Sequence, residues 1–365
     1  VRLLNLPELP EGGDFVESLP ARRAADMNAP AIRAEVDKLA DAADTFRPAA
    51  KPEPGPALVC LADVEPRKVQ WLWPGRVPLG RITLLVGRPG EGKSFLTIDM
   101  ASRVTTGADW PDGSACPSGS VILVCAEDDP ADTIRPRLDA HGADVQRVHL
   151  LPAVRRLNNK GEPSEFMFTL ADVSELEAAL RDRPDCKLIV VDPIGSFLGG
   201  GTDAHRDNEV RSVLAPVARL AEKYGVAVLV VAHRRKSAGS IADDLALGSR
   251  AFTGIARAVW HLTRDGEDKS RRLLLPGKNN LAPEGTGLAF RITGDLPTVV
   301  WEAGSVSMSA DDALAVENAA GRDEKPGPEP EARNAAGGWL RELLRAGPMP
   351  AADVKAEAKA AEYGW

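Results

Sequence analysis

An eight-residue run carries the clearest chemistry in this 365-residue chain. It fits the pattern G-x-x-x-x-G-K-[ST], and its members are Gly87, Arg88, Pro89, Gly90, Glu91, Gly92, Lys93 and Ser94. Glycines at these positions let backbone N–H groups curl around phosphate oxygens, and a helix that begins here adds the positive end of its dipole. Lys93 would reach the β- and γ-phosphates, and Ser94 would ligate Mg²⁺. The alternative is a glycine-rich turn with a surface lysine.

The flanking sequence favours the phosphate-binding interpretation. The apolar run 82–86 comes before the octet, and the run 95–101, which has the composition of a helix start, comes after it. A strand, a loop and a helix in this order are what a phosphate-binding loop requires. The octet, together with Phe95, therefore predicts a site for ATP with Mg²⁺.

Two further apolar runs end in carboxylates. Residues 188–191 lead into Asp192, which has the Walker B form and would hold the Mg²⁺ shell. Residues 121–125 are followed by the acids Glu127, Asp128 and Asp129. Glu127 is our candidate for the general base that polarises the attacking water. The alternative is that these acids cap the next helix, with Pro130 in its first turn. Both roles are compatible, with Asp129 capping and Glu127 catalytic.

His233 follows a fourth apolar run, 226–232. In an open α/β sheet, ligands lie outside the carboxyl ends of the parallel strands. A histidine at this place fits a sensor of the γ-phosphate. The alternative is a structural histidine.

These residues need a scaffold, and strands alternate with helices from about residue 58 to residue 302. This alternation predicts an α/β fold with a mostly parallel sheet. The buried strands are expected at 82–86, 121–125, 188–191 and 226–232, and the helices at 93–105, 172–181 and 210–224. A β-rich extension is expected after His233, with strands at 258–263, 272–275, 288–292 and 298–301.

The rest of the chain divides by composition. Residues 1–56 contain an expected helix at 31–43, opened by Pro30, and a proline-rich linker. Residues 57–303 form the expected ATPase domain, and the polar residues 304–335 form a second linker. A short helical tail, 336–365, is expected to hold helices at 339–345 and 351–361, like an incomplete helix-turn-helix unit.

Composition excludes several other classes. The net charge of −8 argues against a uniformly basic coat for nucleic acid. The four cysteines have no zinc spacing and predict reduced thiols, as in a cytoplasmic protein. No apolar stretch is long enough to span a membrane, and we expect no membrane partner.

Taken together, these motifs resemble the RecA-like ATPases and, among them, the plasmid RepA-type hexameric replicative helicases. The resemblance covers about residues 60–303. Its segments are the lead-in from Trp71 to Gly80, the acidic segment 126–130, the sensor strand end 231–233 and the segment 248–257. The opening residues, 1–16, resemble the closing segment of TOPRIM-type primase modules. The lack of an initiating Met fits either a fragment of a longer primase–helicase fusion or an alternative start codon.

The resemblance implies a homo-oligomeric ring, usually of six subunits, with ATP held between subunits. Arg257 takes the place of the family's arginine finger, and Lys278 matches a second basic residue that points at the neighbour's nucleotide. The alternatives are that both are ordinary surface residues. Single-stranded DNA is the expected ligand of the ring, with a primase or a replication initiator as a possible partner.

Two glycine-containing loops, 199–206 and 234–240, could line the channel of such a ring. Between His233 and Lys278 there are ten Lys and Arg residues against five Asp and Glu residues, which fits a nucleic-acid track or plain solvated loops. Trp71 and Trp73 could stack on a base, although packing against the core fits them better.

We therefore expect a replicative helicase of a plasmid, a phage or a mobile element. The first alternative is an ATP-driven switch or assembly ATPase of the same fold without strand translocation. A second is a non-catalytic nucleotide-binding scaffold, against which Glu127 speaks. A small-molecule kinase fits poorly with the β-rich segment after His233.

Overall fold

The structure is a computed structural model that describes most of the chain. The described residues are 28–42, 58–157, 162–200, 202–204, 206–234, 242–245, 250–283, 285–323 and 330–361. The chain divides into two units, Val1–Arg67 and Lys68–Trp365. The first unit contains helix α2 (Ala29–Ala42) and a short 3₁₀ helix, η1 (Leu61–Asp63). Asn28 caps α2 by accepting the N–H of Ala31 at 3.0 Å, and Pro30 lies in its first turn, as predicted.

The second unit is built on a nine-stranded sheet with the order β13-β12-β11-β10-β3-β9-β8-β4-β5. Its strands are β3 (Ile82–Gly87), β4 (Ser120–Cys125), β5 (Val148–Leu150), β8 (Cys186–Asp192), β9 (Ala227–His233), β10 (Ala258–Arg264), β11 (Arg271–Asn279), β12 (Leu288–Thr293) and β13 (Thr298–Trp301). The six strands from β10 to β5 run parallel, and β11, β12 and β13 are antiparallel. The predicted α/β fold is confirmed. Because β10 pairs with β3, the β-rich extension continues the central sheet.

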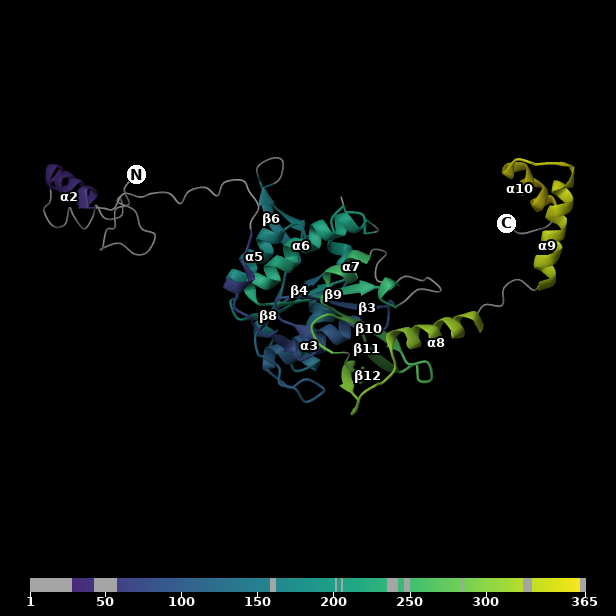
Figure 1. The fold of residues 1–365 in the computed structure, drawn as a ribbon, viewed down its shortest axis with the longest axis horizontal. Helices are drawn as coiled ribbons and strands as arrows, with labels where there is room; N and C mark the ends of the chain where they lie inside the picture. The colour runs from purple at the N-terminus through teal and green to yellow at the C-terminus, as the bar shows by residue number, and fades with distance from the viewer. Residues whose placement is uncertain are drawn as a thin grey trace. The chain divides into compact units, whose positions relative to one another are not determined.

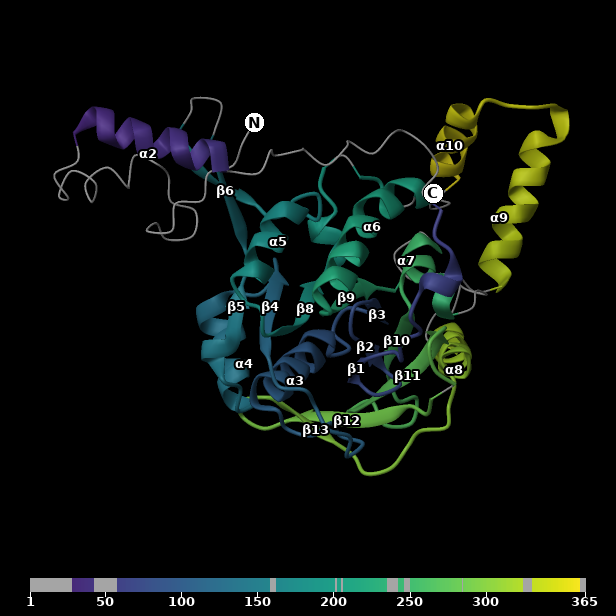
Figure 2. The ribbon, with the colours of Figure 1, turned by 60° about the vertical axis from the view of Figure 1, so that its left-hand side comes forward.

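Helices cover both faces of this sheet (Figure 1, Figure 2). They are α3 (Lys93–Thr106), α4 (Arg135–Ala140), α5 (Val173–Arg181), α6 (Asp207–Tyr224) and α7 (Arg250–Ile255). Successive residues of a strand point to opposite faces. Leu84 and Val86 of β3 accordingly pack in one apolar cluster with α5, α6 and α7, while Leu85 packs in a second cluster with α3 and α4. This two-sided burial explains why the strands read as continuous apolar runs.

The unit also contains two separate two-stranded sheets. β1 (Trp71–Trp73) pairs with β2 (Val77–Pro78), and β6 (Ala153–Leu157) pairs with β7 (Pro163–Met167). Trp73 is buried, stacks on Trp110 with ring centroids 4.6 Å apart and donates its indole N–H to Asp112, so it packs against the core. No strand is expected from the sequence at β6 or β7, because Arg155, Arg156 and Glu165 interrupt any apolar alternation.

Short helical turns link these elements. They are the π-helical turn η2 (Pro130–Ile134) and the 3₁₀ helices η3 (Val145–Arg147), η4 (Ile194–Phe197) and η5 (Ala242–Leu245). Within the part of the chain that the structure describes, no helix is long and apolar enough to cross a membrane.

Helix α8 (Ala310–Asp323) lies inside the segment that we expected to be a linker. Ala310, Ala313 and Leu314 are buried in a cluster with Leu273 and Leu275 of β11. The spacing i, i+3, i+4 places these side chains on one helical face. The face was missed because it has only one large apolar residue, Leu314, and two aspartates interrupt it in the sequence. The tail contains helices α9 (Pro330–Leu343) and α10 (Ala351–Ala360) with the 3₁₀ turn η6 (Leu344–Ala346). Helix α9 begins inside the expected linker, and the likeness to a helix-turn-helix unit stays a prediction.

Candidate nucleotide-binding site

The predicted phosphate loop connects the end of β3 to the start of α3. Lys93 is buried, and its Nζ donates hydrogen bonds to the carbonyl oxygens of Gly87 at 3.0 Å and Arg88 at 2.8 Å. Gly92 has a φ of +97°, and a Cβ atom there would lie 2.6 Å from Cδ1 of Ile292. The left-handed backbone favours glycine here, and a larger residue would also push the Ile292 side chain aside.

The carboxyl ends of the neighbouring strands carry the other predicted residues. Gly87 lies beside His233 in the register of β3 and β9, and Asp192 lies beside Cys125 in the register of β8 and β4. A cavity of about 590 Å³ opens at this edge, within the range of small-molecule sites. The predicted residues that line it are Pro89, Gly90, Gly92, Lys93, Ser94, Phe95, Glu127, Asp192 and His233.

The oxygen donors in this cavity suit Mg²⁺. The Ser94 hydroxyl donates a hydrogen bond to the Asp192 carboxylate, so the two oxygen ligands predicted for the metal are adjacent. Burial raises the pKa of Asp192 to about 6, although Ser94 and Lys93 oppose the shift. A bound cation would stabilise the charged form of this buried carboxylate.

His233 faces the same cavity as a neutral ring. Burial lowers its pKa, and the positive charge of Lys93 lowers it further. Its Nδ1 is buried without a partner among the described residues. A buried polar atom without a partner is costly, so this nitrogen is available to a ligand or to water.

The three acids after β4 have separate roles. Asp129 caps η2 by accepting the N–H groups of Ala131 at 2.7 Å and Asp132 at 3.1 Å, which confirms the predicted capping role. Asp128 pairs with Arg137 at 2.9 Å. Glu127 is exposed and lines the cavity. Its role as the general base stays a prediction.

Sequence reasoning missed the arginines that hold the phosphate loop from outside. Arg264 of β10 donates to the carbonyl of Gly90 at 3.0 Å, and Arg272 of β11 donates to the carbonyl of Glu91 at 3.1 Å. Both come from strands about 180 residues further along the chain. No local pattern marks them, because only the pairing of β10 with β3 brings them here.

Arg257 lies far from this cavity. Its backbone N–H donates to the carbonyl of Ile82 at 2.9 Å, and Ile82 begins β3, whereas Gly87 ends it. At a rise of about 3.3 Å per residue, the two ends of β3 are about 16 Å apart. The Arg257 side chain is exposed at the opposite edge of the sheet, so it cannot serve the nucleotide site of its own chain.

Lys278 lies near Arg257. Its Nζ donates to the carbonyls of Thr253 at 2.7 Å and Ala256 at 3.3 Å, and therefore caps the end of α7. Burial lowers its pKa, and the charges of Arg257 and Arg211 add to the effect. Lys278 thus has partners within its own chain, and its predicted action on a neighbour stays a prediction.

The predicted channel loops are only partly described. In the first loop, Arg206 is exposed and pairs with Glu209 at 3.2 Å, just before α6. Gly201 and His205 of that loop lie outside the described residues, as does the stretch 235–240 of the second loop.

Comparisons with known proteins agree with this geometry. The family model described as "AAA domain" matches residues 48–239, which is more than half of the chain. Two curated relatives are the proteins named "DNA repair protein RadA" from Mycobacterium tuberculosis strains CDC 1551 / Oshkosh and ATCC 25618 / H37Rv. Each is 28% identical over 193 residues, which is 52% of this chain and 33% of the relative. The chain thus spans about one third of the length of these relatives. With its phosphate loop, its strand-end carboxylates and its mixed, mostly parallel sheet, the chain belongs to the AAA domain family of P-loop ATPases with a RecA-like core.

Proposed function

We propose that this protein is a ring-forming motor that hydrolyses ATP with Mg²⁺ and moves on single-stranded DNA, as a replicative helicase of a plasmid, a phage or a mobile element. The observation that carries the proposal is the separation of the site residues onto two opposite edges of one sheet. Lys93, Ser94, Glu127 and Asp192 line one cavity, whereas Arg257 is exposed at the other end of β3.

The first edge supplies what ATP hydrolysis needs within one chain. The backbone of the phosphate loop and Lys93 would hold the β- and γ-phosphates. Ser94 and Asp192 would hold Mg²⁺, which neutralises charge on the phosphates. Glu127 would accept a proton from the water that attacks the γ-phosphorus, as the bond to the β–γ bridging oxygen breaks. His233 would hydrogen-bond the γ-phosphate and sense its departure.

The second edge supplies basic side chains that lie far from the phosphate loop of their own chain. Arg257, Lys278 and Arg211 are close enough that both arginines lower the pKa of Lys278. Clustered cations attract a polyanion such as the triphosphate of an adjacent copy. A ring in which each Arg257 meets the neighbour's ATP would place a cation on the charge that develops during phosphoryl transfer.

The DNA part of the proposal is supported by the relatives and by charge. The proteins that match this chain over 193 residues are named for DNA repair. The segment from His233 to Lys278 carries ten basic residues against five acidic ones, in a chain whose net charge is −8. An excess of cations in a limited segment suits contact with a phosphate backbone.

The test is steady-state ATP hydrolysis by the purified protein, with and without single-stranded DNA, with Lys93→Ala as the blank. The proposal predicts that DNA stimulates turnover and that the stimulation weakens as the salt concentration rises. Turnover that ignores DNA would contradict the motor and would favour an ATP-driven switch of the same fold.

A further inference from the structure

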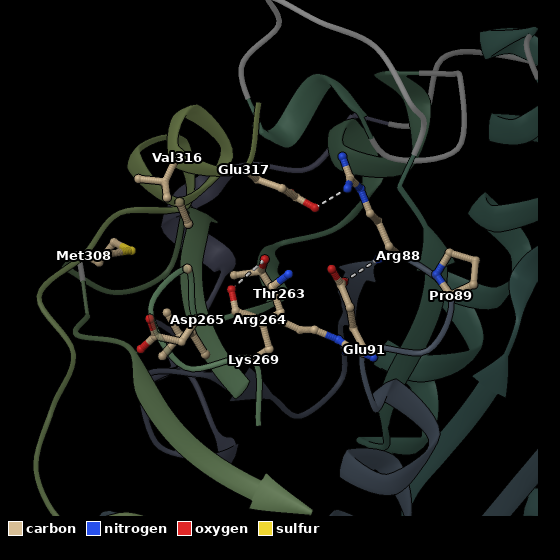
Figure 3. Close-up of a pocket in the computed structure, with 13 residues that line it drawn as sticks. Arg88, Pro89, Glu91, Thr263, Arg264, Asp265, Lys269, Met308, Val316 and Glu317 are labelled. Atoms are coloured by element: carbon tan, nitrogen blue, oxygen red, sulfur yellow. Dashed lines mark hydrogen bonds and ion pairs between the residues drawn. The ribbon is translucent and has the colours of Figure 1, made fainter. Parts of the chain in front are cut away.

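Helix α8 presents one carboxylate to the phosphate loop. Ala310, Ala313 and Leu314 form its buried face, and Glu317 follows at i+7 on that same face. Figure 3 shows Glu317 reaching from α8 toward Arg88, at the border of a cavity of about 380 Å³. The residue therefore points toward the phosphate loop.

Glu317 binds two arginines that come from two different elements. One carboxylate oxygen, Oε1, pairs with Nη1 of Arg88 in the phosphate loop, and the other, Oε2, accepts from Nη2 of Arg234. Arg234 directly follows the sensor candidate His233. A single carboxylate thus joins the phosphate loop to the residue that directly follows the sensor strand.

A second acid closes the network from inside the loop. Glu91 accepts the backbone N–H of Arg88, and its other oxygen lies 3.8 Å from Nη2 of Arg234. The side chain of Arg234 is only 2% exposed, so its charge depends on these acids. Removing one acid from a buried ion network leaves a charge without full compensation, which distorts its surroundings or destabilises them.

We propose that Glu317 is a positioning residue for ATP hydrolysis: by binding Arg88 and Arg234 together, it fixes the phosphate loop relative to His233. Helix α8 lies outside the segment 48–239 that matches the family, yet it forms part of the ATPase machinery. The inference rests on the ATPase activity of the proposed function and is independent of any action on DNA.

The test compares Glu317→Gln with the matched control Glu222→Gln, in ATP hydrolysis without DNA. Glu222 is an exposed glutamate of α6 that pairs with Arg81 at 3.1 Å. Small errors in the alignment of reacting groups are costly, so kcat of Glu317→Gln should fall roughly 10- to 100-fold while KM for ATP changes less than about threefold. The control should match the unmodified protein. A Glu317→Gln variant with unchanged kcat would overturn the proposal, even if its melting temperature were lower.

A double-mutant cycle tests the Glu317–Arg88 contact from both sides, and Arg88→Gln alone still tests it if Glu317→Gln folds poorly. The partner change is Arg88→Gln, on a side chain that is 35% exposed and therefore tolerant of substitution. If the two residues act through one contact, the double variant should be no slower than the slower single variant. Additive losses of kcat would show independent roles and would contradict the proposal. Absence of DNA stimulation would overturn the motor and leave this inference standing, because every readout here is free of DNA.

Discussion

The two edges of the parallel sheet differ in what they can do alone. At the carboxyl edge, Lys93, Asp192 and His233 share one cavity, and burial shifts the pKa of each of them. At the opposite edge, Arg257 is exposed, and its backbone binds Ile82 at the far end of β3 from the phosphate loop. Perturbed groups in a cavity mark a site that is ready for chemistry. In the proposed ring, one chain would carry a binding half and a finishing half that serve two different nucleotides.

The largest expected effect comes from removing the exposed arginine at the edge opposite the phosphate loop. Arg257→Ala should lower ATP turnover roughly 10³- to 10⁵-fold, because the finger stabilises charge in the transition state. ATP binding should persist, because the residue lies about 16 Å from the phosphate loop along β3. Steady-state hydrolysis and equilibrium ATP binding measure the two properties. Arg219→Ala, at an exposed arginine of α6, is the control. Loss of ATP binding in Arg257→Ala would show that the halves are not separate.

The next effect falls on the carboxyl edge. Glu127→Gln should lower kcat about 10²- to 10⁴-fold with ATP still bound, because the amide cannot take the proton of the attacking water. Asp129→Asn is the matched control, because asparagine keeps the cap on η2. Single-turnover hydrolysis separates the two variants. Equal losses in both would assign the acids to structure alone.

A third prediction concerns the pH dependence of stability at the carboxyl edge, where the side chain of Glu91 is 5% exposed. Burial raises its pKa to about 7, against the opposing charges of Arg234 and Lys93. A carboxyl group with a raised pKa binds its proton more tightly in the folded state, so stability is lost as the pH rises from about 4.5 to about 7.

Relative to Glu91→Gln, the unmodified protein should therefore lose up to about 3 kcal/mol of unfolding free energy across this range. Urea denaturation at a series of pH values measures it. A difference between the two proteins that stays constant with pH would contradict the buried, proton-binding carboxyl.

The smallest effect concerns Lys278 at the exposed edge. Lys278→Met removes the hydrogen bonds to the carbonyls of Thr253 and Ala256, which lie at the end of α7 just before Arg257. Turnover should fall about tenfold, with ATP binding unchanged, because the finger loses its support. Kinetics and melting temperature together check this. A variant as fast and as stable as the unmodified protein would show that Lys278 supports neither α7 nor the neighbour's site.

Much of the carboxyl edge could be predicted from the sequence, because each of its residues follows a local signal. Asp192 and His233 end apolar runs that the sheet buries, and parallel strands bring such ends to one edge. The residues that hold the phosphate loop in place could not be predicted in this way. Arg264, Arg272 and Glu317 reach the phosphate loop only after distant strands and α8 have packed. For Glu317 a weak signal existed, since it continues the i, i+3, i+4 spacing of the face made by Ala310, Ala313 and Leu314.

The most direct test of the two-halves account mixes two inactive variants. Lys93→Ala keeps Arg257 but lacks a working phosphate loop, and Arg257→Ala keeps the phosphate loop but lacks the finger. In a mixed oligomer, a Lys93→Ala subunit can offer its arginine to the intact nucleotide site of an Arg257→Ala neighbour. The account predicts that the mixture hydrolyses ATP well above the sum of the separate variants, with a maximum near equal proportions. A mixture that stays at that sum at every ratio, while both variants still assemble, would contradict an arginine shared between subunits.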